Sequence, residues 1–194
     1  MLLYVHIPFC ESKCPYCAFG SVVGKRNLTS AYFDAMIADF REQIVKFDVK
    51  NGDIETVFIG GGTPSAVDAG YYERLFETVA PYLAANAEIT TEANPNSASQ
   101  KWLSQMKSCG VNRVSFGAQS FFEDKLKFLG RIHSREQIFK AVENAHAAGF
   151  KSINLDLIYD TKFDTKKRLL AEVESLKSLA ITHLSAYSLT LEEN

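Results

Sequence analysis

The segment LLYVHIPFCESKCPYC, residues 2–17, joins an apolar run to three closely spaced cysteines. Residues 2–8 are rich in apolar and β-branched side chains, which predicts a strand. Cys10, Cys14 and Cys17 follow this strand directly. In β/α folds the functional groups gather on the strand ends and on the loops that follow them. The segment therefore predicts a β/α protein with a thiol site at the end of its first strand.

Five more strand-like runs alternate with helical patterns along the rest of the chain. The strands are expected at 54–59, 87–93, 113–118, 152–159 and 182–189, and the helices at 31–47, 70–84, 99–109, 134–148 and 165–179. Ser30 is the expected N-cap of the first helix. Strands separated by helical crossovers pair in parallel. Because six units are fewer than the eight of a closed barrel, we expect a partial (β/α)6 TIM-type barrel.

Composition limits the class of protein. The 194 residues are 46% hydrophobic, which suits one domain over 1–194. The 21 basic and 23 acidic residues give a net charge of -2, unlike the basic surface of a nucleic-acid binder. No apolar run approaches the roughly 18 residues of a membrane span, and the N-terminus lacks the features of a signal peptide. We expect a cytoplasmic protein without a transmembrane segment. Since the sequence ends at 191–194, just after the last predicted strand, we also expect that a C-terminal portion is missing.

The cysteine triplet taken alone allows three interpretations. A structural zinc site needs four ligands, and His6 could supply the fourth. A [4Fe-4S] cluster held by three cysteines leaves one iron open to a small molecule. A disulfide or a redox thiol pair is the third possibility. The residues favour the open cluster, and the fourth thiol, Cys109, is expected to be a small buried apolar residue and not a ligand.

Polar residues stand late in three of the predicted strands. They are Glu92 in TTEANP, Gln119 in SFGAQS and Asp156 in NLDLIY, and Arg131 follows in LGRIHS. Two carboxylates can bind ribose hydroxyls, an amide makes mixed hydrogen bonds, and a guanidinium binds a carboxylate. The glycine triplet in IGGGTPS, residues 59–65, lets the backbone approach a ligand closely. This set suits a nucleoside joined to an amino acid.

The motifs YVHIPFC, GGGTPS, TTEANP, NRVSFGAQSF, GRIH and INLDLIY together resemble the radical SAM superfamily. Within it, the chain resembles the family of oxygen-independent coproporphyrinogen III oxidases and their HemW-like haem-chaperone branch. The resemblance implies a [4Fe-4S] cluster and S-adenosylmethionine, whose sulfonium is cleaved to a 5'-deoxyadenosyl radical by an electron passed through the cluster. The residues implied are Cys10, Cys14 and Cys17 for the cluster, with Tyr4 near it; the backbone at Tyr16 for adenine; Gly61, Gly62 and Thr63 for the methionine amino end; and Glu92, Gln119, Arg131 and Asp156 for the ribose and the methionine carboxylate.

Two departures from the oxidase pattern favour the chaperone branch. Phe19 stands where the oxidase has a fourth cysteine, and Tyr4 lies almost at the start of the chain. The resemblance then implies a protein that binds haem and transfers it to an acceptor protein. The alternatives are an oxidase that decarboxylates coproporphyrinogen III propionates and a non-catalytic zinc-stabilised domain. An electron donor such as flavodoxin or ferredoxin is also implied. Asp160 replaces the first residue of the usual Gly-Leu-Pro, which leaves open the conformation of the loop after the fifth strand.

Overall fold

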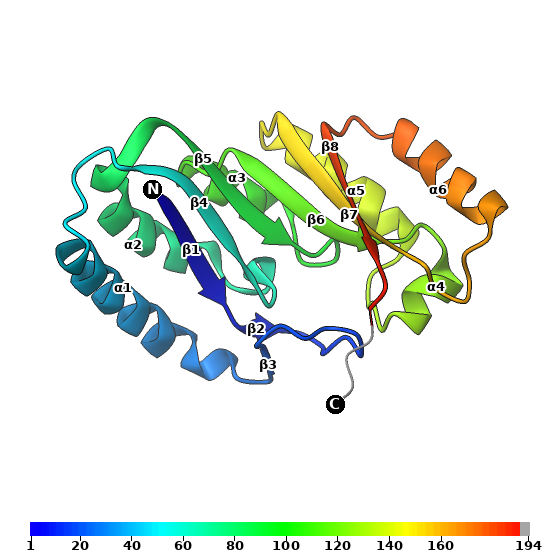
Figure 1. The fold of residues 1–194 in the computed structure, drawn as a ribbon, viewed down its shortest axis with the longest axis horizontal. Coiled ribbons are helices and arrows are strands. Elements are labelled where there is room, and N and C mark those ends of the chain that lie inside the picture. Colours follow the sequence, from blue (N-terminus) through cyan, green and yellow to red (C-terminus); the bar gives the residue numbers. More distant parts are fainter. Residues whose placement is uncertain (191–194) are drawn as a thin grey trace.

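The sheet of this protein is parallel throughout and remains open at its edges (Figure 1). The computed structural model describes residues 1–190. Its six strands lie in the order β1 (Leu2–Ile7), β4 (Ile54–Gly61), β5 (Leu83–Ala93), β6 (Arg113–Gln119), β7 (Ser152–Tyr159) and β8 (His183–Ser188). A short pair, β2 (Phe9–Cys10) and β3 (Val22–Val23), flanks the cysteine loop. The order of the strands follows the sequence, as successive right-handed crossovers require.

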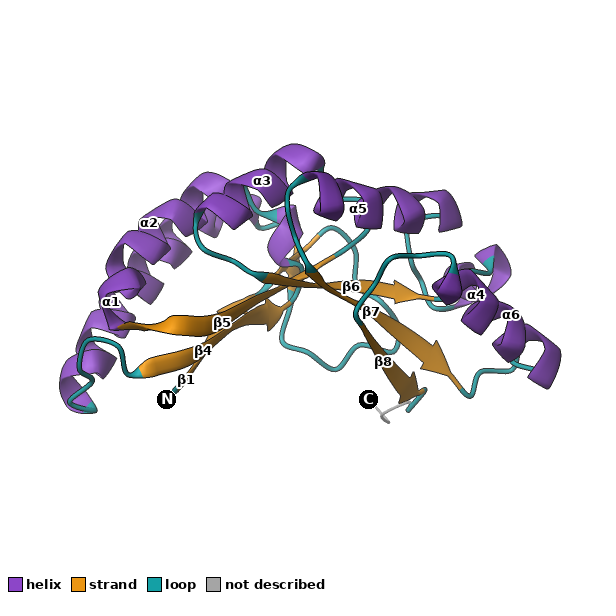
Figure 2. Cartoon of the chain, turned by 90° about the horizontal axis from the view of Figure 1, so that it is seen from above, coloured by secondary structure: helices purple, strands orange, loops and turns teal. Residues whose placement is uncertain are grey.

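The helices form a second layer on the convex face of the sheet, and the concave face lies open in Figure 2. They are α1 (Thr29–Lys46), α2 (Ala69–Val79), α3 (Gln100–Ser108), α4 (Glu123–Phe128), α5 (Arg135–Ala147) and α6 (Lys166–Lys177), with 3-10 turns at Arg26–Leu28, Pro64–Ala66 and Ala80–Tyr82. Fully buried side chains such as Ile59, Phe116 and Leu155 fill the space between the layers. Because β1 and β8 do not pair, the expectation of a partial barrel is confirmed.

Four helices begin with a side-chain cap, among them α2, where Asp68 accepts the N–H of Gly70, and the first helix does not. Ser99, Ser134 and Thr165 each accept a backbone N–H of the first turn of α3, α5 and α6. The expected cap Ser30 is wrong, because a 3-10 turn runs straight into α1 and the helix has already started at Thr29. The hydroxyl of Thr29 instead donates to the carbonyl of Arg26 at 2.8 Å.

Two boundaries and one helix also differ from the sequence expectations. The helix expected over 70–84 ends at Val79, and β5 already begins at Leu83. The 3-10 turn that contains Pro81 separates them, because proline cannot supply the N–H that would continue the helix. The short helix α4 was not expected from the sequence. No helix in the described part of the chain is long and apolar enough to cross a membrane.

The loop after β7 keeps a tight turn without glycine. Asp160 has φ +65°, in the left-handed region, which aspartate tolerates better than most residues with a side chain. Its carboxylate accepts a hydrogen bond from the Ser188 hydroxyl at 3.1 Å. The turn geometry that glycine would permit is therefore retained. The residues 191–194, on which the expectation of a missing C-terminal portion rests, lie outside the described residues.

Candidate functional site

The three clustered cysteines line one cavity of about 60 Å³. Cys10 ends β2, and the backbone N–H of Cys17 donates to the carbonyl of Cys14 at 3.1 Å, which folds the loop back on itself. All three thiols are free, as is Cys109, so the disulfide interpretation is wrong. Tyr16 also lines this cavity.

Two glycines let the cysteine loop pack closely against the strand ends. A Cβ on Gly62 would lie 2.8 Å from the carbonyl oxygen of Ile7, to which the N–H of Gly62 donates at 2.7 Å. A Cβ on Gly130 would lie 2.6 Å from Cδ of Pro15, and Gly130 has φ +66°. Since real Cβ atoms do not approach other atoms so closely, both positions require glycine.

Thr63 and Arg131 contact the sulfur atoms. Oγ1 of Thr63 lies 3.4 Å from Sγ of Cys10, and Nη1 of Arg131 lies 3.5 Å from Sγ of Cys14. Nη2 of Arg131 donates to Oδ1 of Asn94 at 2.6 Å and to the carbonyl of Gly117 at 2.9 Å. The Arg131 guanidinium therefore contacts the sulfur of one of the three clustered cysteines directly. Asn94 was missed from the sequence, although it stands two residues after Glu92 in the motif TTEANP.

These residues fit an iron–sulfur cluster. Three free thiols surround one cavity, and Nε of Arg131 is buried there without a hydrogen-bond partner among residues 1–190. Each thiolate of such a cluster binds a different iron, so the sulfurs surround a volume and not a single point. In the same range, no three His, Cys, Asp or Glu side chains are grouped to hold one metal ion.

His6 lies outside this cavity, which contradicts its expected alternative role as a zinc ligand. Its Nδ1 is 3.2 Å from the Tyr4 hydroxyl, and its Nε2 is 2.8 Å from the carbonyl of Gly20. The ring packs over Gly61, where a Cβ would lie 2.5 Å from it. Tyr4 and His6 line a separate groove between β1 and α1, so Tyr4 reaches the cysteine loop only through His6.

Glu92 and Asp156 form a second, carboxylate part of the site. Oε2 of Glu92 accepts the N–H of Gly61 at 3.1 Å. Burial raises the pKa of Glu92 to about 7; the Gly61 bond opposes this shift and the charge of Asp156 adds to it. Burial likewise raises the pKa of Asp156, against the hydrogen bonds from Ser115 and Asn154. Two partly buried carboxylates beside the glycine segment are suited to accept hydroxyl groups of a ligand.

Gln119 and Tyr16 complete the set. Gln119 ends β6 with φ +64°, after a register shift in its pairing with β7. Its amide nitrogen would lie 2.8 Å from a Cβ on Gly117, next to the guanidinium of Arg131. Burial raises the pKa of Tyr16 to about 12, so its phenol stays neutral at pH 7. The structure thus brings most of the expected site residues to the cysteine cavity or to the carboxylate part beside it. Tyr4 does not line the cavity, but burial and the charge of Glu92 raise its pKa, so it lies near the carboxylate part.

The chemistry of such a site is divided between cofactor and protein. A bound cluster would supply the electron that cleaves the sulfonium of S-adenosylmethionine. The protein would hold the cluster through Cys10, Cys14 and Cys17 and place the Arg131 guanidinium against it. Backbone groups of Gly62 and the nearby carboxylates would orient the small molecule.

Comparison with known proteins agrees with this arrangement. The chain is 36% identical over 193 residues to the haem chaperone HemW of Lactococcus lactis, covering 98% of this chain and 49% of that protein. It is 38% identical over 195 residues to the HemW of Escherichia coli, covering 99% of this chain and 51% of that protein. The chain therefore spans about half the length of the curated relatives it matches.

Solved structures show the same fold. Coproporphyrinogen III oxidase (HemN) from Escherichia coli, a radical SAM enzyme, superposes with a TM-score of 0.87 at 28% identity, over 97% of this chain and 44% of that one. The radical S-adenosylmethionine methyltransferase TsrM from Kitasatospora setae shares the fold alone, with a TM-score of 0.66 at 10% identity, over 96% of this chain and 36% of that one. The family model of the radical SAM superfamily matches residues 4–175. The chain belongs to the radical SAM superfamily, whose members use a [4Fe-4S] cluster and S-adenosylmethionine.

Proposed function

We propose that this chain binds a [4Fe-4S] cluster through Cys10, Cys14 and Cys17, binds S-adenosylmethionine beside it, and serves as a haem chaperone. The observation that carries the proposal is the cavity lined by three free thiols. In the sequence, Phe19 stands where the oxidase has a fourth cysteine. Phe19 is 63% exposed and offers no ligand. The similarity to HemW proteins, which are named as haem chaperones, supports the same role.

The proposal assigns the remaining site residues by the chemistry of S-adenosylmethionine. Gly61, Gly62 and Thr63 bind the methionine amino group, and the backbone at Tyr16 faces adenine. The ribose and the methionine carboxylate are held by Glu92, Gln119, Arg131 and Asp156, with Tyr4 supporting the site through His6. Haem, an electron donor such as flavodoxin or ferredoxin, and a haem-acceptor protein complete the partners. We place the protein in the cytoplasm, where free thiols stay reduced.

The second candidate is an oxygen-independent coproporphyrinogen III oxidase. The observation in its favour is the close superposition on HemN, with a TM-score of 0.87. The reaction would remove carbon dioxide from propionate side chains of coproporphyrinogen III. Both functions use the same cluster and the same S-adenosylmethionine, so the substrate distinguishes them.

One experiment separates the two functions. The protein is expressed from its complete reading frame, reconstituted anaerobically with iron and sulfide, and supplied with S-adenosylmethionine, a reductant and either haem or coproporphyrinogen III. A chaperone should bind haem, shown by its absorption spectrum, and leave coproporphyrinogen III unchanged. Sustained release of carbon dioxide would overturn the chaperone assignment in favour of the oxidase.

The carboxylates Glu92 and Asp156 lead to a prediction about affinity. Glu92→Gln and Asp156→Asn each replace an anionic acceptor by an amide of nearly the same shape. Loss of one charged hydrogen bond costs about 1.5–3 kcal/mol, so we expect S-adenosylmethionine affinity to fall about tenfold to a hundredfold. Equilibrium binding to the reconstituted variants measures this. Unchanged affinity in both variants would remove these residues from the site.

The raised pKa of Glu92 also predicts how the stability of the protein depends on pH. Glu92→Gln should weaken S-adenosylmethionine binding but stabilise the ligand-free protein. Its pKa rises from the ordinary 4.5 to about 7, so folding favours the protonated carboxyl. This contribution to stability is fully present below pH 4.5 and is lost as the pH rises through about 7. In protein free of S-adenosylmethionine, Glu92→Gln should therefore raise Tm relative to the parent more at pH 8 than at pH 5. An equal Tm difference between variant and parent at pH 5 and pH 8 would contradict the raised pKa of Glu92.

A further inference from the structure

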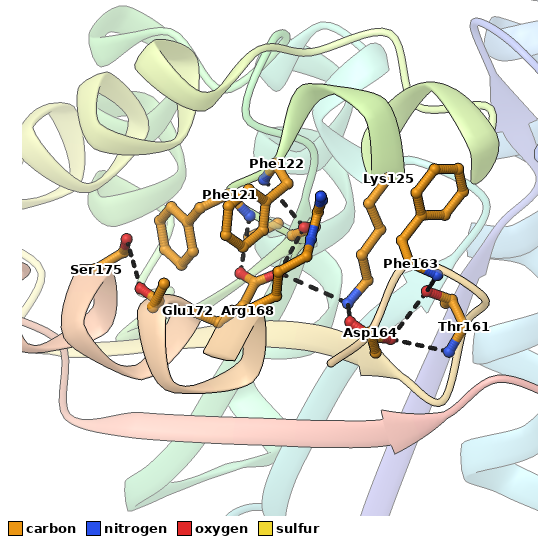
Figure 3. Close-up of polar contacts among 12 residues, drawn as sticks. Phe121, Phe122, Lys125, Thr161, Phe163, Asp164, Arg168, Glu172 and Ser175 are labelled. Carbon is orange, nitrogen blue, oxygen red and sulfur yellow. Dashed lines mark hydrogen bonds and ion pairs between the residues drawn. The ribbon is translucent and has the colours of Figure 1, made fainter. Parts of the chain in front are cut away.

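A buried group of charged side chains lies between α4 and α6, outside the cavity described above (Figure 3). It consists of Lys125 in α4, Asp164 in the loop after β7 and Glu172 in α6, whose side chains are 1%, 7% and 4% exposed. Nζ of Lys125 lies 2.7 Å from Oδ1 of Asp164 and 3.6 Å from Oε1 of Glu172. Charged residues so deeply buried occur where they are paired and hold neighbouring groups in place.

The carboxylate of Glu172 holds the segment that directly follows β6. Its Oε1 accepts the hydroxyl of Ser120 at 2.6 Å, and its Oε2 accepts the backbone N–H of Phe121 at 2.9 Å. The same Ser120 oxygen accepts the N–H of Phe122 at 3.0 Å. Glu172 of α6 thereby holds Ser120 and Phe121 directly, and Phe122 through the Ser120 hydroxyl. Figure 3 shows Glu172 facing Phe121.

This turn begins immediately after Gln119, the residue with the left-handed backbone at the end of β6. A residue with a side chain adopts φ +64° only where the surrounding structure imposes it. Around Gln119, the backbone N–H of Ser120 donates to the carbonyl of Ala118 at 2.8 Å, and Ser120 and Phe121 are held in turn by their hydrogen bonds to Glu172. The amide of Gln119 then lies beside Gly117 and the guanidinium of Arg131.

The same charged group also fixes the loop after β7. Oδ2 of Asp164 accepts both the N–H and the hydroxyl of Thr161, at 2.8 and 2.9 Å. Lys125 therefore connects the turn after β6 to the loop after β7 through two carboxylates. Gln119 lies in β6 and Asp156 lies in β7, so the segments that follow both of these strands are held by the same charged group.

We propose that Glu172, anchored by Lys125, is a positioning residue for S-adenosylmethionine, because it holds the Ser120–Phe121 turn and through it the Gln119 side chain. The inference rests on the proposed function, in which Gln119 contacts that molecule. Glu172 itself touches neither the cavity nor the thiols. The Ser120–Phe121 turn connects Glu172 to Gln119, and this is the route that the proposal assigns.

A double-mutant cycle on the reconstituted holoprotein tests this route. S-adenosylmethionine affinity is measured for the parent, Glu172→Gln, Gln119→Ala and the double variant, by titration followed in the visible spectrum of the oxidised cluster, without a reductant. We expect each single change to weaken binding about threefold to tenfold, as for one hydrogen bond. The double variant should bind within about twofold of Gln119→Ala, because both changes remove the same contact.

The matched control is Asp124→Asn in the same contact between α4 and α6. Asp124 accepts two hydrogen bonds from Arg168, at 2.9 and 2.5 Å, but does not touch Ser120 or Phe121. It should leave affinity within about twofold of the parent, while Tm is recorded for every variant. Equal weakening by Asp124→Asn, or additive losses in the double variant, would overturn the inference.

The outcomes also separate the inference from the function on which it rests. If the parent protein does not bind S-adenosylmethionine, or if Gln119→Ala binds it normally, the proposed site fails and the inference fails with it. If Gln119→Ala weakens binding and Glu172→Gln does not, the inference alone is overturned. Should Glu172→Gln fail to fold, Ser120→Ala removes only one hydroxyl from the same contact, and the same non-additivity with Gln119→Ala is expected.

Discussion

Replacement of Cys14 by alanine is expected to remove the iron–sulfur cluster almost completely. Three thiolates hold three irons of the cluster, and two cannot retain it, so iron should fall from about four atoms per chain to near zero. Cys14 also receives the Arg131 contact at 3.5 Å, which would be lost with the sulfur. Iron and sulfide analysis after anaerobic reconstitution, together with the visible absorption, measures the effect.

Cys109 provides the matched control for this experiment. It lies at the C-cap of α3 and packs against the core. Burial raises the pKa of its thiol to about 11, and Cys109 does not line the cavity that holds the other three cysteines. Cys109→Ala should keep the full iron content. Iron loss in this variant would show that the wrong thiols were assigned, and stoichiometric zinc without iron in the parent would overturn the cluster itself.

Replacement of Lys125 by methionine is expected to cost the protein about 3–5 kcal/mol of stability. The change leaves the carboxylates of Asp164 and Glu172 buried without their cation, which is among the most destabilising of single changes. For a domain of this size, each kcal/mol lowers Tm by about 2–4 °C. Thermal unfolding of the variant beside the parent measures the loss.

An exposed lysine serves as the comparison. Lys140 pairs with Glu143 one helical turn away in α5, and both side chains are largely exposed, at 65% and 69%. Such pairs contribute about 0–1 kcal/mol, so Lys140→Met should leave Tm nearly unchanged. If Lys125→Met also left Tm nearly unchanged, the ion pairs of Lys125 with Asp164 and Glu172 would not stabilise the fold as described above.

The strands of this fold were predictable because most of them contain runs of apolar and β-branched residues. The run at 152–159 coincides with β7, and the others differ by a few residues at their ends. Helix α4 was missed because its six residues, EDKLKF, are too few to show a helical period. Its Lys125 reads as a surface residue in the sequence, and only the distant Asp164 and Glu172 make its burial possible.

In the candidate site, too, the residues in local sequence motifs were predictable, and the contacts between residues distant in sequence were not. The cysteine spacing and the late-strand Glu92, Gln119 and Asp156 are local signals. Glu92 and Gln119 lie at the ends of β5 and β6, and Asp156 lies in the second half of β7. The bridge from Arg131 to Asn94 joins residues 37 positions apart, and no local pattern announces it. Contacts of that kind depend on the register of neighbouring strands, which sequence reasoning does not supply.

The contact between Cys14 and Arg131 also sets an order of events during synthesis. The two residues are 117 positions apart, so the cysteine loop is made long before its enclosing wall. At about 5–20 residues per second, the ribosome needs roughly 6–23 s to reach Arg131 after Cys14. During that interval the thiols of the nascent chain are open to oxidants and to stray metal ions. Under the proposed function, the wall that encloses the cluster exists only after residue 131 has been translated, and the yield of loaded cluster should depend on how well the cell protects those thiols until then.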